Sequence, residues 1–173
     1  MNIFDCTTFF NERLMMDLRF NILNDHVSKF VVVESTFSHS GEKKKLNFNI
    51  DDYPKFKDKI IYIPIDKEPY GLVKGEELIK NPFHKRLNSI KRIEQSYNYM
   101  SNGISEALDN DFIMLSDNDE IPNLDSIEFK KSRNNFFLFK QKFLFYKFDL
   151  LYDKFLWYGT KACKKKKLKN FSS

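Results

Sequence analysis

Three carboxylates lie close together directly after a short apolar run. The run, residues 112–115, has the composition of a buried strand, and Asp117, Asp119 and Glu120 follow it. Pro122 cannot easily continue a strand, so the carboxylates belong at its carboxyl end, where open α/β sheets bind ligands. If the backbone stays extended, Asp117 and Asp119 project to one face with Cα atoms about 6.6 Å apart. That spacing suits two carboxylates on one hard divalent cation, or one on the cation and one on a hydroxyl group.

Two other interpretations of the acidic cluster stay open. An Asp-x-Asp after a strand often only caps a turn or the following helix. The spacing of Asp117, Asp119 and Glu128 also matches that of ligands in an EF-hand loop. Pro122 stands where that loop needs its glycine, and Ile121 replaces an oxygen ligand, so a calcium loop is disfavoured.

The elements around this cluster predict an α/β fold. Strand-like runs alternate with helix-like periodicity, which is typical of a mostly parallel, Rossmann-like sheet flanked by helices. An aromatic, partly alternating stretch near the C-terminus indicates an added antiparallel segment. The expected strands span residues 3–6, 29–34, 59–64, 112–115 and 136–148, and the expected helices span residues 12–24 and 84–108.

Apolar spacing predicts which side of the first helix faces the core. Leu14, Leu18 and Ile22 recur every four residues and form the expected buried stripe, with Met15 and Leu23 beside them, and Asn11 is the expected N-cap. In the second helix, Gly103 lies inside the periodic pattern and costs about 1 kcal/mol relative to alanine.

Length, charge and cysteine content limit the class to which the protein can belong. The 173 residues are enough for one domain with a core, and 42% of them are hydrophobic, which is typical of a globular chain. The net charge of +5 comes largely from two lysine runs, at residues 43–45 and from Lys164 to Lys167. No aromatic-basic nucleic-acid signature accompanies them, so we expect no nucleic-acid partner and a peripheral contact of Lys164 to Lys167 with an anionic membrane.

The remaining composition points to a reducing compartment. Two cysteines, Cys6 and Cys163, make no disulfide framework, and no Cys/His cluster has zinc-site spacing. No signal peptide or membrane-spanning run is present, so a cytoplasmic location is expected. The chain ends soon after its second lysine run with no closing element, which predicts a single domain, 1–173, that is incomplete at its C-terminus.

Three segments resemble glycosyltransferase family 17. The segment Asp5-Cys6-Thr7-Thr8-Phe9-Phe10-Asn11-Glu12 is similar to the family's opening Asp-Cys-x-x-Phe-Phe-Asn-Glu. Residues 30–36, followed by Ser40-Gly41 and lysines, resemble its second block. Residues 115–122 resemble its Asp-x-Asp-Glu-Ile-Pro block, and residues 82–86 resemble its basic helix start more loosely. No segment matches the Gly-Trp-His block that the family carries near its C-terminus.

The resemblance implies a nucleotide-sugar-binding fold of the GT-A type and a transferase. The expected reaction moves N-acetylglucosamine from UDP-N-acetylglucosamine to a saccharide acceptor, as in the β-1,4-mannosyl-glycoprotein N-acetylglucosaminyltransferases. Mn²⁺ or Mg²⁺, held by Asp119 and Asp117, would neutralise the leaving diphosphate. Because a β product from an α-linked donor requires inversion, a carboxylate would deprotonate the acceptor, and Glu120 is the candidate base.

The same resemblance suggests contacts to the donor. Glu34 and Ser35 would bind base or ribose, Asp117 the ribose or sugar hydroxyls, and Arg86, or its neighbour Lys85, the diphosphate at a helix N-terminus. Asp5 would contact the donor or hold the turn after it. Glu34 capping a turn and Arg86 in a surface ion pair are the structural alternatives.

Two further possibilities concern function. Trp157 could stack on an acceptor sugar, although a core position is the commoner role for tryptophan. The chain could also be an inactive sugar-nucleotide-binding remnant, or a basic α/β module that binds polyanions through its lysines.

Overall fold

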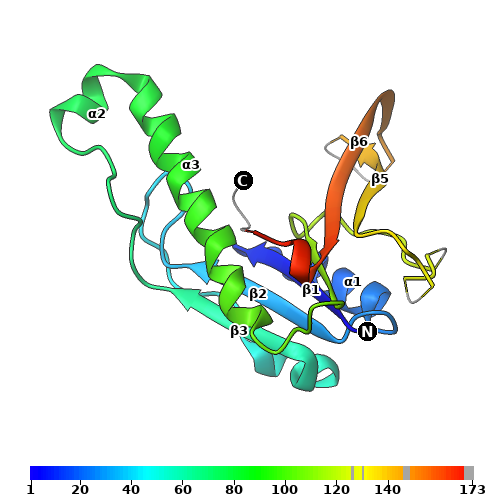
Figure 1. Ribbon diagram of the computed structural model, residues 1–173. Coiled ribbons are helices and arrows are strands. Elements are labelled where there is room, and N and C mark those ends of the chain that lie inside the picture. The colour runs from blue at the N-terminus through cyan, green and yellow to red at the C-terminus, as the bar shows by residue number, and fades with distance from the viewer. Residues whose placement is uncertain (126, 130, 146–148, 170–173) are drawn as a thin grey trace.

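One six-stranded sheet organises the computed structural model, which describes residues 1–125, 127–129, 131–145 and 149–169 (Figure 1). The strands are β1 (Ile3–Phe9), β2 (Lys29–Ser35), β3 (Ile60–Ile65), β4 (Phe112–Leu115), β5 (Phe136–Leu144) and β6 (Leu151–Lys164). The helices are α1 (Arg13–Leu23), α2 (Glu76–Lys80) and α3 (Pro82–Tyr99), with 3-10 turns η1 (Ile50–Asp52), η2 (Pro54–Lys59), η3 (Met100–Ile104) and η4 (Lys165–Lys167).

The sheet has a parallel half and an antiparallel half. Its order is β3-β2-β1-β4-β6-β5, and the first four strands run parallel. β6 runs antiparallel to β4, and β5 runs antiparallel to β6. The predicted α/β class is therefore confirmed, including the antiparallel aromatic addition. Residues 146–148 of that predicted aromatic stretch lie outside the described residues.

Alternate residues of the central strands face two different cores. Phe30 and Val32 of β2 lie on the side of α1, in a cluster of aromatic rings that includes Phe20 and Phe56. Val31 and Val33 face the other side, where η3 and the C-terminal end of α3 cover the sheet. Because both faces of β2 are covered, its apolar run is continuous rather than alternating. Cys6 lies in the second core, where it packs as a small buried hydrophobe.

The predicted buried face of α1 is wrong except at Leu23, which is buried. Leu14, Leu18 and Ile22 are exposed by 62%, 38% and 54%, whereas the residues turned to the sheet are Met16, Arg19, Phe20 and Leu23. The reason is Arg19, which is 0% exposed because it has an acidic partner on β1. The helix also begins one residue later than expected, at Arg13, and Glu12 rather than Asn11 takes the N-cap position.

Only the end of α3 touches the sheet. The helix stops at Tyr99 and passes into η3, so the predicted helix to Leu108 is too long. Figure 1 shows the N-terminal part of α3, with α2, extending away from the sheet on one side, while the β5–β6 hairpin extends on the other. None of the helices in the described ranges is long and apolar enough to cross a membrane.

Replacing Gly103 by alanine is expected to destabilise the protein, although alanine is the better helix former. A Cβ atom at Gly103 would lie 2.3 Å from Cγ1 of Val31. Overpacking of this kind costs about 1–3 kcal/mol, against a propensity gain of about 1 kcal/mol at most. Urea unfolding measures the change, with Ser105→Ala on the exposed neighbouring turn as control. A free energy of unfolding that rises in Gly103→Ala would contradict this packing.

Candidate functional site

The carboxylates after β4 lie in a tight turn. The strand ends at Leu115, and the Glu120 amide donates to the Asp117 carbonyl at 3.1 Å, which closes a turn over Asn118 and Asp119. The prediction that Asp117 and Asp119 share one face of an extended strand is therefore wrong. The chain reverses between them because Asn and Asp readily occupy turn positions. We call residues 117–120 the acidic turn.

A buried arginine on α1 binds the backbone of this turn from the interior of the protein. Nη1 of Arg19 donates to the backbone carbonyls of Asp117, Asn118 and Glu120, at 3.1, 3.3 and 3.2 Å. Nη2 also donates to the hydroxyl of Ser116. One rigid, planar group thus contacts three carbonyls of the turn, which a guanidinium can do and a lysine ammonium cannot. Two of these carbonyls have a second donor, the Glu120 amide for Asp117 and the Thr160 hydroxyl for Glu120.

Asp5 is the counter-charge of this arginine. Its two carboxylate oxygens accept from Nε and Nη2 of Arg19 at 2.7 and 2.6 Å, and Asp5 is 1% exposed. Both oxygens are therefore engaged in the interior. This position corrects the expectation that Asp5 contacts the donor, and gives it the role of pairing the charge that positions the acidic turn.

Glu120 folds back over the turn. Its Oε2 accepts from the Asp117 amide at 3.1 Å, and its Oε1 accepts from the indole N–H of Trp157 at 3.0 Å. Gly159 leaves the space for it, because a Cβ atom there would lie 2.6 Å from Oε1 of Glu120. Burial raises the pKa of Glu120, as do the neighbouring charges of Asp117 and Asp119, while the two hydrogen bonds oppose that rise.

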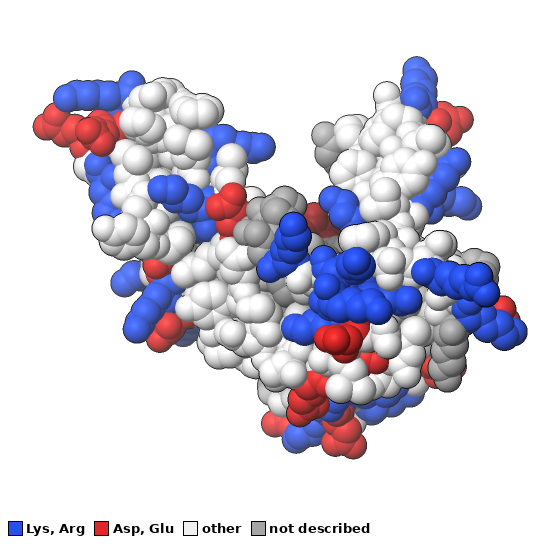
Figure 2. Space-filling view, viewed as in Figure 1, with Lys and Arg blue, Asp and Glu red and all other residues white. Residues whose placement is uncertain are grey.

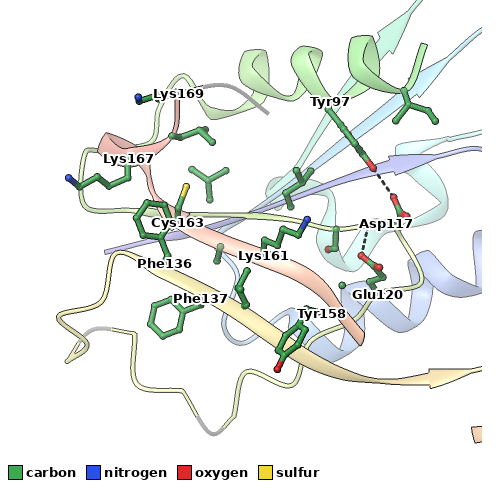
Figure 3. A pocket seen from close by; sticks show the side chains of 18 of the residues that line it. Tyr97, Asp117, Glu120, Phe136, Phe137, Tyr158, Lys161, Cys163, Lys167 and Lys169 are labelled. Carbon is green, nitrogen blue, oxygen red and sulfur yellow. Dashed lines mark hydrogen bonds between the residues drawn. The ribbon is translucent and has the colours of Figure 1, made fainter. Parts of the chain in front are cut away.

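The Asp117 side chain is also contacted by a tyrosine hydroxyl. The Tyr97 hydroxyl, at the end of α3, donates to Oδ1 of Asp117 at 3.0 Å (Figure 3). Burial raises the pKa of Tyr97, and the Asp117 charge raises it further, so the phenol stays protonated and remains a donor. Asp117 is exposed, whereas Asp5 is buried, so the acidic turn presents this carboxylate outward.

Two pockets meet at Asp117. The first, which we call the β1/β2 pocket, has a volume of about 450 Å³ and is lined by the ends of β1, β2 and the acidic turn, with the loop after β2 and α3. The second, the β4/β6 pocket, has a volume of about 770 Å³ and lies between α3 and the β4, β6 and β5 strands (Figure 3). Asp117 lines both pockets, and Glu120 lines the second.

Of the two predicted residues at the carboxyl end of β2, one faces the β1/β2 pocket. Ser35 lines it. Glu34 is 1% exposed and accepts hydrogen bonds from the amides of Asn47 and Phe48, at 2.8 and 3.0 Å, and from Lys44 and the Tyr62 hydroxyl. Glu34 therefore holds the chain that follows β2 in place. This is close to the alternative that Glu34 only caps a turn, and it corrects the expected contact with the donor.

The basic residues near the acidic turn differ from the predicted ones. Arg86 lies on the exposed part of α3, 11 residues and so about 16 Å along the axis from Tyr97, which corrects the expected diphosphate clamp. Arg92, lower on the same helix, lines the β1/β2 pocket together with Lys44. Arg92 pairs with Glu68, with Nη2 and Oε1 2.6 Å apart, and donates to the His39 carbonyl.

The basic run near the C-terminus lies beside the β4/β6 pocket. Figure 2 shows Lys and Arg side chains gathered over η4, between the two projecting arms. Lys167 lines the pocket, and Lys166 donates to the Asn110 side chain at 2.9 Å. Contact of this run with an anionic membrane stays a prediction.

The acidic turn fits a divalent cation only in part. Carboxylate oxygens are the donors that Mg²⁺ and Mn²⁺ prefer, and Asp117 and Asp119 are both exposed. Across the part of the chain that the structure describes, no group of three or more His, Cys, Asp or Glu residues could hold a metal. The protein therefore supplies too few ligands for an ion by itself, and the oxygens of a bound diphosphate would have to complete the shell.

Sequence reasoning missed Arg19, Tyr97 and Arg92. The sequence did contain a signal for Arg19, because a charged residue lies among the apolar residues of α1 and an aspartate precedes it on the first strand. The other two carry none, because their positions depend on where α3 crosses the sheet.

Breaking the Arg19–Asp5 pair is expected to destabilise the fold strongly. Arg19→Met and Asp5→Asn each leave a buried partner uncompensated, which costs about 3–5 kcal/mol. Arg13→Met is the matched control on the same helix, because Arg13 and Asp52 form an exposed pair worth at most about 1 kcal/mol. Urea unfolding compares them, with Arg19→Lys as the milder variant should Arg19→Met not fold. Equal losses for Arg13→Met and the Arg19 variants would contradict the assignment.

Comparison with protein-family models gives the identity of the family. Residues 1–170 match the model of glycosyltransferase family 17. The match therefore covers the acidic turn and the strands and helices that line both pockets. Comparisons with curated proteins and with solved structures gave no match. The chain belongs to glycosyltransferase family 17 and is a glycosyltransferase.

Proposed function

We propose that this enzyme transfers N-acetylglucosamine from UDP-N-acetylglucosamine to a saccharide acceptor, with inversion at the anomeric carbon and the help of a divalent cation. The observation that carries the proposal is that Asp117 lines two adjoining pockets. A donor in one and an acceptor in the other would meet beside a single carboxylate, as a direct displacement requires. The choice of donor sugar and of inversion rests on the resemblance of the three sequence blocks described above.

The β1/β2 pocket suits the nucleotide. It lies at the carboxyl ends of parallel strands, where open α/β sheets bind such ligands. Phe10 lies on its wall and is 49% exposed, and the Lys44 ammonium lies 5.1 Å from the centroid of its ring, so that a stacking base would use the ring beside a cation. Lys44 and Arg92 line it as cations that are ion-paired with Glu34 and Glu68, and the hydroxyls of Ser35 and Ser38 add hydrogen-bonding groups for ribose or phosphate.

Asp117 and Asp119 would hold the cation together with the donor diphosphate. When bound, a divalent cation stabilises the charge that develops on the leaving diphosphate. The role of the protein is to hold the two carboxylates in place. Arg19 does this by donating hydrogen bonds to backbone carbonyls of the turn. Tyr97 orients Asp117 by donating to one of its oxygens.

Glu120 is placed to accept the proton of the acceptor hydroxyl. It lines the β4/β6 pocket, and Trp157 and the Asp117 amide fix its orientation. Its raised pKa makes it a stronger base than an ordinary glutamate, which suits general base catalysis. Trp157 is 37% exposed beside it and offers its ring to a sugar.

Binding of UDP and Mn²⁺ is expected to be mutually dependent. Because two exposed carboxylates hold an ion weakly, titration calorimetry should detect little Mn²⁺ binding alone and clear binding in the presence of UDP. Asp117→Ala should abolish the Mn²⁺ dependence of UDP affinity. Asp58→Ala, an exposed residue just before β3 at the opposite edge of the sheet, is the matched control. UDP affinity that is equal with and without Mn²⁺ would refute the cation role.

The acid limb of the pH–rate profile should report Glu120. Turnover falls as Glu120 is protonated, and its raised pKa places that fall above the range of an ordinary glutamate. Glu120→Gln should lower kcat by about 100-fold or more at unchanged UDP affinity. Trp157→Phe removes a hydrogen bond that lowers this pKa, so the acid limb should move to higher pH. Near-normal turnover in Glu120→Gln would rule it out as the base.

A further inference from the structure

The β4/β6 pocket continues past Glu120 along an uncovered face of the sheet. We propose that this continuation binds an acceptor whose sugar is joined through a phosphate to an apolar chain. The inference rests on the proposed function, because it takes this pocket as the acceptor site. Three features carry it: an aromatic and acidic end, a cation beyond that end, and apolar residues beside and beyond the cation whose outer members are exposed.

The reacting end of the pocket suits a sugar ring. Glu120 and Asp117 supply carboxylates, and Tyr97, Trp157 and Tyr158 supply aromatic faces. Sugars are commonly bound by such a mixture of hydrogen-bond acceptors and rings, whose apolar faces cover the C–H faces of the sugar. The hydroxyl to be glycosylated would lie against Glu120.

Beyond this end the pocket floor is apolar in two rows across the sheet. The backbone register aligns Leu115, Lys161 and Leu138 in one row and Ile113, Cys163 and Phe136 in the next. Residues aligned in this way lie side by side on one face, and successive rows are about 6.6 Å apart. Lys161 is the one charged residue among these six.

The outer members of these rows are uncovered. Leu138 is exposed by 64% and Phe136 by 61%, and both line the pocket. A chain of sugars lying over them would give up hydrogen bonds to water without replacing them. An apolar chain would instead remove apolar surface from water, which is favourable. The far part of the pocket therefore selects against a plain glycan.

Lys161 lies between the two parts. Figure 3 shows it between the Glu120 end and the Cys163 end of the pocket. No described Asp or Glu lies within ion-pair distance of its ammonium. The order along β6 is Trp157 and Gly159 at the sugar end, then Lys161, then Cys163. This order of aromatic, cationic and apolar groups matches the order sugar, phosphate, chain.

The lysines at the far rim agree with the same ligand. Lys167 and Lys169 line the pocket beyond the apolar rows. An apolar chain longer than the pocket would extend out of it into a lipid layer, and lysines at that exit would face anionic headgroups. The apolar rows and the basic rim are thus explained by one amphipathic ligand.

The test uses the single tryptophan of the chain, Trp157, as an intrinsic fluorescent reporter at the sugar end. Three probes are titrated below micellar concentrations: the octyl ester of mannose 1-phosphate, mannose 1-phosphate, and octyl mannoside. The octyl ester should bind at least about tenfold more tightly than either of the others, because it alone meets both Lys161 and the apolar rows.

Two variants separate the contributions. Lys161→Met should weaken both phosphate probes by about fivefold and leave octyl mannoside unchanged. Leu138→Ser should weaken both octyl probes and leave mannose 1-phosphate unchanged. Both side chains are exposed, so the fold should survive, and Lys142→Met on β5 is the control. Equal affinity for the three probes, or phosphate binding that Lys161→Met does not change, would overturn the inference.

The same protein separates this inference from the proposed function. UDP with Mn²⁺ reports the β1/β2 pocket, which none of these variants touches. UDP binding without discrimination among the three probes overturns the acceptor inference alone. Absence of UDP binding in the unaltered protein overturns the proposed function, whatever the mannose probes do.

Discussion

The site depends on one buried guanidinium. Arg19 is removed from water between α1 and the sheet, and a charge there would be strongly unfavourable by itself. Asp5 neutralises it, and Ser116 and three backbone carbonyls of the acidic turn take its remaining donors. The result is a turn whose backbone is fixed from inside the molecule, so that Asp117 and Glu120 need no ligand to reach their positions.

The division of the site into two pockets follows from this turn. Its outward carboxylate, Asp117, marks the boundary, with phosphate-compatible basic groups on one side and an aromatic and apolar surface on the other. Gly159 makes the boundary possible, because a side chain there would meet both Glu120 and Gln141. Tyr97 and Trp157 then hold the two carboxylates from opposite sides, through hydrogen bonds of 3.0 Å each.

The parts of this structure that were predictable are those set by local pattern. The apolar runs of β2 and β4 identify buried parallel strands, and the proline after the acidic cluster places it at a strand end. The apolar stripe of α1 misled because the true inner face is centred on Arg19, whose partners lie on β1 and after β4. The extended Asp-x-Asp was wrong because the Glu120 amide and the Asp117 carbonyl close a local turn, and Arg19, 98 or more residues away in the chain, supports that turn. Arg86 and Arg92 could not be told apart without knowing which end of α3 meets the sheet.

The strand order also has a consequence for how the molecule assembles. β1 pairs with β2 shortly after it in the chain, but its other edge pairs with β4, about 109 residues away. Closing so long a loop is entropically unfavourable until both edges of β1 are filled, so this pairing forms late. As the chain emerges from the ribosome, Arg19 and Asp5 can associate long before Ser116 and the turn exist. In a nascent chain the contacts of Arg19 with the acidic turn can therefore form only after β4 and the turn have been synthesised, and a fluctuation that detaches β4 from β1 also threatens those contacts.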